Sequence, residues 1–217
     1  MQKPPLVLFG GTFDPIHYGH LRTALELQEV LNVPHINLVP TGEPVHKAST
    51  GGSAVQRFEM VRLAVESEPA LVADDCELIS DEPCYTINTL MKKRAEVGED
   101  LPIILVMGMD SLLGIKSWSY WQQLTDFGHL LIVARPGYEP EFDSELQCFI
   151  DQHKVEDLET LSLRPSGHLA MHQLTPMNVS ATQVRKIIKR GSNPRFLIPD
   201  GVWNFIKNER LYDANER

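Results

Sequence analysis

Two histidines stand three residues apart near the N-terminus, in the stretch GGTFDPIHYGH that covers residues 10–20. A continuous apolar run precedes the stretch and a helical pattern follows it, so His17 and His20 fall where a buried strand ends and a helix begins. Gly10 and Gly11 let the backbone approach a ligand closely and expose amide groups, which suits phosphate. Three interpretations stay open: phosphate binding, which we favour; a zinc site, which would need a further protein ligand; and a structural glycine turn.

Comparison with two well-known phosphate loops narrows the choice. The stretch lacks the G-x-G-x-x-G pattern of nicotinamide dinucleotide folds, and it lacks the G-K-[ST] ending of a P-loop. Asp14 is predicted to cap the helix or to form a turn before it. Gly19, between the histidines, leaves room for a bulky group against the helix.

A second cluster lies far downstream, in NVSATQVRKIIKRG (residues 178–191). Ser180 and Gln183 have the spacing of a capping box, which predicts a helix from Ala181 onward. Ser180, Thr182 and Arg185 place two hydroxyls and a guanidinium beside the free amides of the helix start, a suitable anion site. The alternative is an ordinary capped helix with a solvated arginine. Two phosphate-suited helix starts in one domain favour a polyphosphate.

A third cluster, GMDSLLGIKSWSYW (residues 108–121), follows another predicted buried strand. Asp110 could accept a hydrogen bond from a ribose hydroxyl, or it could cap the following helix. Trp118 and Trp121 could stack on a planar ring, although aromatic side chains more often pack in cores. Lys47, after the second predicted strand, could bind phosphate or simply be solvated.

The elements that must position these residues alternate between strand and helix. Such alternation with short connections predicts a doubly wound α/β fold with a mostly parallel sheet and a helical C-terminal end. Ligands in such sheets bind beyond the carboxyl ends of the strands. The first and third clusters begin at such strand ends, and the second cluster is expected to lie close to the first. The predicted strands are 5–11, 35–40, 71–79, 101–108, 129–137 and 168–174, and the predicted helices are 18–31, 54–65, 86–97, 119–124, 144–153, 181–190 and 202–211.

Length and composition indicate one ordinary globular domain over residues 1–217, with a core at about 5–137, a peripheral segment at about 138–165 and a C-terminal strand and helices at about 168–212. The net charge of −9 argues against a nucleic-acid-coating surface but allows a small anionic substrate. Three cysteines without C-x-x-C spacing, and no signal-peptide or membrane-spanning run, predict a cytoplasmic protein with reduced thiols. The sequence leaves the oligomeric state open, a homodimer being one option.

Together these motifs resemble a known family. GGTFDPIHYGH resembles the signature of the H-x-G-H nucleotidyltransferase superfamily, and VSATQVR resembles its C-terminal phosphate motif, commonly written I-S-A-T-x-[IV]-R. With CYTINTL and GMDSLLGIKSWSYW between them, in order and over almost the whole chain, the sequence resembles the bacterial nicotinate-nucleotide adenylyltransferases. The resemblance implies the Rossmann-like nucleotidyltransferase fold.

The resemblance also implies an activity: ATP and nicotinate mononucleotide give deamido-NAD and pyrophosphate in NAD biosynthesis, with Mg²⁺ held mainly through the ATP phosphates rather than by protein ligands. It implies that His17, His20 and Arg185 are catalytic. The implied ATP-binding residues are these three together with Gly10, Gly11, Thr12, Phe13, Gly108, Asp110, Ser180 and Thr182, and the implied mononucleotide-binding residues are Lys47, Tyr85, Thr86 and Trp118.

The implied chemistry needs no protein nucleophile. A phosphate monoester has a second pKa of about 6, so the acceptor is already largely dianionic at neutral pH. Positioning and charge neutralisation are then the expected means of catalysis, without a covalent intermediate. Two alternatives remain: the same fold adenylylating nicotinamide mononucleotide or another phosphate acceptor, and a non-catalytic nucleotide- or zinc-binding module.

Overall fold

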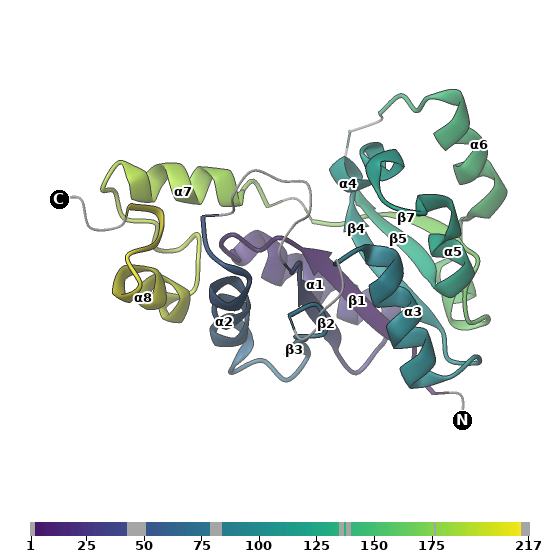
Figure 1. The fold of residues 1–217 in the computed structure, drawn as a ribbon, viewed down its shortest axis with the longest axis horizontal. Helices are drawn as coiled ribbons and strands as arrows, with labels where there is room; N and C mark the ends of the chain where they lie inside the picture. The colour runs from purple at the N-terminus through teal and green to yellow at the C-terminus, as the bar shows by residue number, and fades with distance from the viewer. Residues whose placement is uncertain are drawn as a thin grey trace.

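A computed structural model describes residues 3–42, 51–78, 84–134, 137, 140–175 and 177–213. Its centre is a seven-stranded sheet in the order β3-β2-β1-β4-β5-β7-β6, in which every pair of neighbouring strands is parallel (Figure 1). The strands are β1 (Leu6–Gly11), β2 (Ile36–Pro40), β3 (Leu71–Ala73), β4 (Ile103–Gly108), β5 (His129–Ala134), β6 (Lys154–Val155) and β7 (Leu169–Gln173).

Strand order reverses between β1 and β4. The chain first builds outward from β1 through β2 to β3, then returns to place β4 on the other side of β1, with Leu8 opposite Leu105. Such a reversal leaves a crevice beyond the carboxyl ends of the two strands, which is where ligands bind in open parallel sheets. Gly10 and Gly11 end β1 at this crevice, and Gly108 ends β4.

Helices cover both faces of the sheet, as the alternation of side chains along β1 requires. Val7 and Phe9 belong to one hydrophobic core and Leu8 to the other. The first core packs against α1, α2, α7 and α8, and the second against α3, α4, α5 and α6. The helices are α1 (Tyr18–Leu31), α2 (Ala54–Val65), α3 (Thr86–Val97), α4 (Met109–Leu113), α5 (Leu124–Phe127), α6 (Ser144–His153), α7 (Ala181–Lys189) and α8 (Asp200–Asn208).

This architecture confirms the predicted doubly wound α/β fold, and all of the described strands are parallel. In Figure 1, α7 and α8 lie beside α2 at one end of the molecule, and α6 lies at the opposite end. Among the described residues, no helix has the length and apolar composition needed to cross a membrane. Cys76, Cys84 and Cys148 are free thiols.

Several predicted elements were wrong in extent. The strand expected at 71–79 ends at Ala73, because the Asp74 side chain accepts from the Cys76 amide and turns the chain. The helix expected at 119–124 begins only at Trp121, as a 3₁₀ turn (Trp121–Gln123) that leads into α5, because Tyr120 has a left-handed φ of 54°. The two-residue strand β6 was not predicted.

The C-terminal end also differs from the expected helix at 202–211. Helix α8 begins at Asp200 and ends at Asn208, and a separate 3₁₀ turn, Leu211–Asp213, follows it. Arg210 and Tyr212 both have positive φ angles, 54° and 59°, which a continuous helix cannot contain. The chain therefore turns back toward the sheet after α8.

Candidate active site

Two cavities, of about 690 and 530 Å³, adjoin at the carboxyl ends of β1 and β4. We call them the tryptophan cavity, which Trp118 lines, and the histidine cavity, which His17 and His20 line. Gly10, Gly11 and Ser111 line both cavities, so the end of β1 and the start of α4 form their common wall. The fold therefore presents two adjacent binding volumes at its topological switch point.

His17 and His20 cap the first turn of α1 for each other. His17 is the N-cap residue: its Nδ1 accepts from the His20 backbone N–H at 3.4 Å, and His20 Nδ1 accepts from the His17 N–H at 3.3 Å. The two rings stack with centroids 3.6 Å apart and an interplanar angle of 18°. Because both Nδ1 atoms accept, each neutral imidazole carries its proton on Nε2. Asp14 does not cap the helix, since His17 occupies that position, but it lies in a turn before the helix, which was the other predicted role.

Both imidazoles are held neutral at pH 7. Burial lowers the pKa of His17 to about 4. Burial, together with the nearby His17, keeps the pKa of His20 well below its usual value. Two neutral rings with protons on Nε2 offer hydrogen-bond donors without two adjacent positive charges. Such donors suit phosphate oxygens, and an incoming polyphosphate would favour their protonation.

One glycine before the histidine pair and one within it provide necessary space. A Cβ on Gly11 would lie 2.8 Å from the ring of Phe13, which is buried and packs edge-on against His20 at 5.0 Å. A Cβ on Gly19 would lie 2.9 Å from His17 Nδ1. Steric fit therefore explains why the motif has glycine at these two places.

The other residues predicted to bind ATP are divided between the two cavities. Phe13, Gly108, Asp110 and Ser180 line the histidine cavity, whereas Thr12 lines the tryptophan cavity. Gly108 is the N-cap of α4 and Asp110 lies inside that helix, so the alternative in which Asp110 caps the helix is wrong. Asp110 is exposed and lines the histidine cavity instead.

The start of α7 reaches the histidine cavity through its first residues. Ser180 is the N-cap, as predicted, and its Oγ accepts from the Gln183 N–H at 3.2 Å. Thr182 and Arg185 do not line the cavity. The Arg185 guanidinium donates to the Asp14 carbonyl and, at 3.4 Å, to Thr182 Oγ1. The structure thus brings His17, His20 and Ser180 to one cavity and holds Arg185 at its side.

The tryptophan cavity contains three of the four residues predicted to bind the second substrate. Tyr85, Thr86 and Trp118 line it, while Lys47 lies outside the described residues. Tyr85 is the N-cap of α3, and its side chain makes no cap hydrogen bond with the helix start beside the cavity. Trp121, the other tryptophan considered, is buried and packs against Phe149 at 4.9 Å.

Sequence reasoning missed further lining residues of the tryptophan cavity. Glu77 accepts from the Gly42 N–H at 3.0 Å and from the Thr89 hydroxyl at 2.9 Å, and burial raises the pKa of its carboxyl. Ser111 was missed as well, although it stands in the common wall. An acid in CELI and a serine in GMDSLL carry no recognisable spacing, so no sequence signal could have found them.

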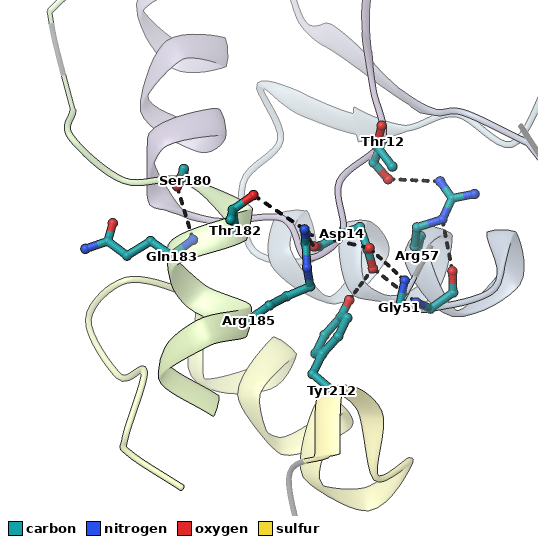
Figure 2. A network of polar contacts seen from close by, with 10 residues as sticks. Thr12, Asp14, Gly51, Arg57, Ser180, Thr182, Gln183, Arg185 and Tyr212 are labelled. Carbon is teal, nitrogen blue, oxygen red and sulfur yellow. Dashed lines mark hydrogen bonds and ion pairs between the residues drawn. The ribbon is translucent and has the colours of Figure 1, made fainter. Parts of the chain in front are cut away.

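A buried polar network adjoins residues 12–17, the segment between β1 and α1 that we call the histidine loop; Thr12 and Asp14 of this loop are shown in Figure 2. Arg57, fully buried, donates to the carbonyls of Thr12 and Gly42 at 2.9 Å and of Gly52 at 3.3 Å. Asp14, 5% exposed, accepts from the Gly51 and Gly52 amides at 2.9 and 3.1 Å and from the Tyr212 hydroxyl. The loop that carries the histidines is thus fixed to segments far from it in sequence.

Zinc was the principal competing interpretation of the histidine pair. Within the described ranges, no group of three or more His, Cys, Asp or Glu side chains is arranged to hold a metal ion. Both Nδ1 atoms are already hydrogen-bond acceptors. The arrangement therefore favours an anion over a protein-held metal.

Comparison with known proteins identifies the class. The chain belongs to the cytidylyltransferase-like family, whose model matches residues 8–187. Within that class, it belongs to the nicotinate-nucleotide adenylyltransferases. It is 42% identical over 215 residues to an Aeromonas salmonicida protein named a "probable nicotinate-nucleotide adenylyltransferase", which covers 99% of this chain and 100% of that protein. A Hahella chejuensis protein of the same name is 42% identical over 98% of both chains.

Solved structures agree on the fold. A Plasmodium falciparum nicotinic acid mononucleotide adenylyltransferase complexed with NaAD has a TM-score of 0.71 at 16% identity, covering 98% of this chain and 99% of that one. The same enzyme complexed with APC gives 0.70 at 16% identity over 99% and 100% of the two chains. The architecture is therefore shared even where the sequence has diverged.

Proposed function

We propose that this chain transfers the adenylyl group of ATP to nicotinate mononucleotide, giving deamido-NAD and pyrophosphate in NAD biosynthesis. The observation that carries the proposal is the pair of adjacent cavities that share Gly10, Gly11 and Ser111. Two phosphate-bearing substrates must meet for this reaction, and a common wall of small residues allows their phosphates to approach each other. Family membership supports the same assignment.

We assign ATP to the histidine cavity. The Nε2 donors of His17 and His20, and the hydroxyl and helix-start amides at Ser180, are placed to contact its phosphates. Gly108 and Asp110 are assigned to the adenosine. Arg185 and Thr182 stand beside the cavity, and we assign to the phosphates the guanidinium donors that Asp14 and Thr182 do not occupy.

We assign nicotinate mononucleotide to the tryptophan cavity. Trp118 offers a flat surface for the pyridine ring, and the start of α3 at Tyr85 and Thr86 offers backbone donors for its carboxylate. A carboxylate accepts several hydrogen bonds and donates none, so a site built from donors should reject the carboxamide. The proposed contact with Lys47 remains a prediction from the sequence.

The reaction we infer is an in-line displacement. A phosphate oxygen of the mononucleotide attacks the α-phosphorus of ATP, a new P–O bond forms, and the bond from the α-phosphorus to the bridging oxygen breaks as pyrophosphate leaves. The protein holds the two anions together and donates to the charge that grows on the leaving group. No side chain needs to act as a nucleophile.

Mg²⁺ is proposed as the accompanying cation. The histidine cavity offers mainly hydrogen-bond donors, with Asp110 as a carboxylate in its lining. This set fits a cation that arrives on the ATP phosphates better than a cage of protein ligands, because Mg²⁺ usually binds one or two carboxylates plus substrate phosphates. Bound there, Mg²⁺ would neutralise negative charge on the pyrophosphate.

The test is pyrophosphate release with ATP and each mononucleotide in turn, with the dinucleotide product identified by mass. We expect release with nicotinate mononucleotide, and a kcat/KM at least about 100-fold lower with nicotinamide mononucleotide. Comparable values for the two would contradict the proposed selectivity, and no release with either would contradict the assignment. A cytoplasmic location and a homodimer both stay predictions.

A further inference from the structure

The C-terminal turn contacts the histidine loop at one residue. Tyr212, in the 3₁₀ turn Leu211–Asp213, donates its hydroxyl hydrogen bond to Oδ1 of Asp14, 198 positions earlier in the chain (Figure 2). Asp14 lies three residues before His17. Neither residue lines the tryptophan cavity or the histidine cavity, so a direct contact with substrate in these two cavities does not explain why they are joined.

The Asp14 carboxylate is an anion that the fold has enclosed. It is 5% exposed and accepts from the amides of Gly51 and Gly52 and from the Tyr212 hydroxyl. Arg185 Nη1 lies 3.7 Å from its Oδ2. A buried carboxylate is costly unless it is fully hydrogen-bonded, so each of these donors fixes its position. Burial and the bond to Asp14 raise the pKa of Tyr212, so its hydroxyl remains a proton donor at any working pH.

Asp14 in turn binds one side of the Arg185 guanidinium. Nη1 of the guanidinium donates to the Asp14 carbonyl and Nη2 donates to Thr182 Oγ1. A guanidinium has five N–H donors in a rigid, planar fork. With part of the fork fixed at Asp14 and Thr182, the direction in which its remaining donors can point is restricted.

The space around the Tyr212 ring is specific to this arrangement. A Cβ on Gly51 would overlap the ring, whereas a Cβ on Gly52 would meet nothing nearer than Arg57 Cγ at 3.5 Å. The ring therefore lies directly over the Gly51 backbone, whose N–H donates to the same carboxylate. The contact is enclosed on several sides and is not a chance approach of a chain terminus.

We propose that Tyr212 is a positioning residue for adenylyl transfer, which fixes the Asp14 carboxylate and thereby orients Arg185 toward the ATP phosphates. The inference rests on the proposed function, because it gives Arg185 a phosphate to bind. Preorganising a cation in this way spares the cost of ordering it when the substrate arrives. The C-terminal turn then contributes to the reaction without touching either substrate.

The experiment is a double-mutant cycle with Tyr212→Phe and Arg185→Gln in the full chain. Tyr212→Phe should lower kcat/KM for ATP about tenfold, the effect of one hydrogen bond to a charged group, and leave KM for nicotinate mononucleotide within about twofold. In the Arg185→Gln background the same change should have almost no effect, because the residue it acts through is gone. Tyr120→Phe, which removes the hydroxyl of an exposed tyrosine that lines neither cavity, is the matched control.

A reduction of full size in the Arg185→Gln background, or none in the wild-type background, would overturn the inference. Thermal unfolding of each protein identifies a variant that has lost its fold. In that case Gly51→Ala displaces the Tyr212 ring without changing Tyr212 itself, and Gly52→Ala, whose Cβ does not meet the ring, is its control. Binding of a non-hydrolysable ATP analogue is measured through the same cycle. That readout needs no acceptor, so failure of the proposed reaction with every mononucleotide is distinguishable from failure of the positioning role.

Discussion

Gly19→Ala is the change whose effect the structure defines most closely. The added Cβ would lie 2.9 Å from Nδ1 and 3.0 Å from Cε1 of His17, against an ordinary contact distance of 3.4–4 Å. The His17 ring must therefore move by about 0.5 Å, and it is already stacked on His20 with centroids 3.6 Å apart. A misplacement of about 1 Å in a catalytic site can cost about 100-fold in rate, so half of that predicts a kcat about tenfold lower.

Stability should respond differently from activity. Replacing glycine by alanine in a helix stabilises it by up to about 1 kcal/mol, and the crowding at His17 offsets part of this gain. We expect the free energy of unfolding to change by less than about 1 kcal/mol while kcat falls. Steady-state kinetics and urea unfolding on the same preparations measure both quantities.

Gly201→Ala provides a matched control. Gly201 is the second residue of α8, just as Gly19 is the second residue of α1, and its Cβ would meet Leu63 atoms only at 3.8 Å. This variant should keep its kcat and gain a few tenths of a kcal/mol. If Gly19→Ala retained kcat within twofold of wild type, the argument that the histidine rings are fixed by contact would be refuted.

Three further predictions concern the second cavity, the reaction course and pH. Trp118→Ala should raise KM for nicotinate mononucleotide about tenfold while KM for ATP changes less than twofold. Equal changes in the two KM values would contradict the assignment of Trp118 to the pyridine ring. Transfer from ATP chiral at the α-phosphorus should invert that centre, and retention would require a covalent intermediate. Burial lowers the pKa of His129 to about 4 from 6.5, so the unfolded chain takes up the proton first as pH falls below 6.5. Because of this histidine, the free energy of unfolding should fall by about 2 kcal/mol between pH 7 and pH 5, as measured by urea unfolding. If the free energy of unfolding of His129→Gln fell by as much as that of the wild type over the same pH range, the prediction would be contradicted.

Local signals made many of the helices predictable. Helix α2 begins after Ser53, whose side chain accepts from the Gln56 N–H in a capping box, and its bounds match the expected 54–65. Helix α7 likewise begins after Ser180. The buried strands β1 and β4 were recognisable because both of their faces are covered and their sequences are continuously apolar.

The parts that failed depend on contacts between distant residues. Whether Asp14 caps a helix or accepts from Tyr212 depends on the path of a C-terminal turn 198 positions away. The two-residue strand β6 exists only because β7 offers it an edge. The motifs indicated a phosphate site, but the division into two cavities at Ser111 depends on how α4 follows β4.

A crystal structure with a non-hydrolysable ATP analogue and nicotinate mononucleotide bound together tests the central claim most directly. The account predicts the triphosphate against the Nε2 atoms of His17 and His20 and the Ser180 helix start, with the pyridine ring beside Trp118 and the two phosphates meeting across the wall at Gly11 and Ser111. Both ligands in a single cavity, or a triphosphate remote from the histidines, would contradict it.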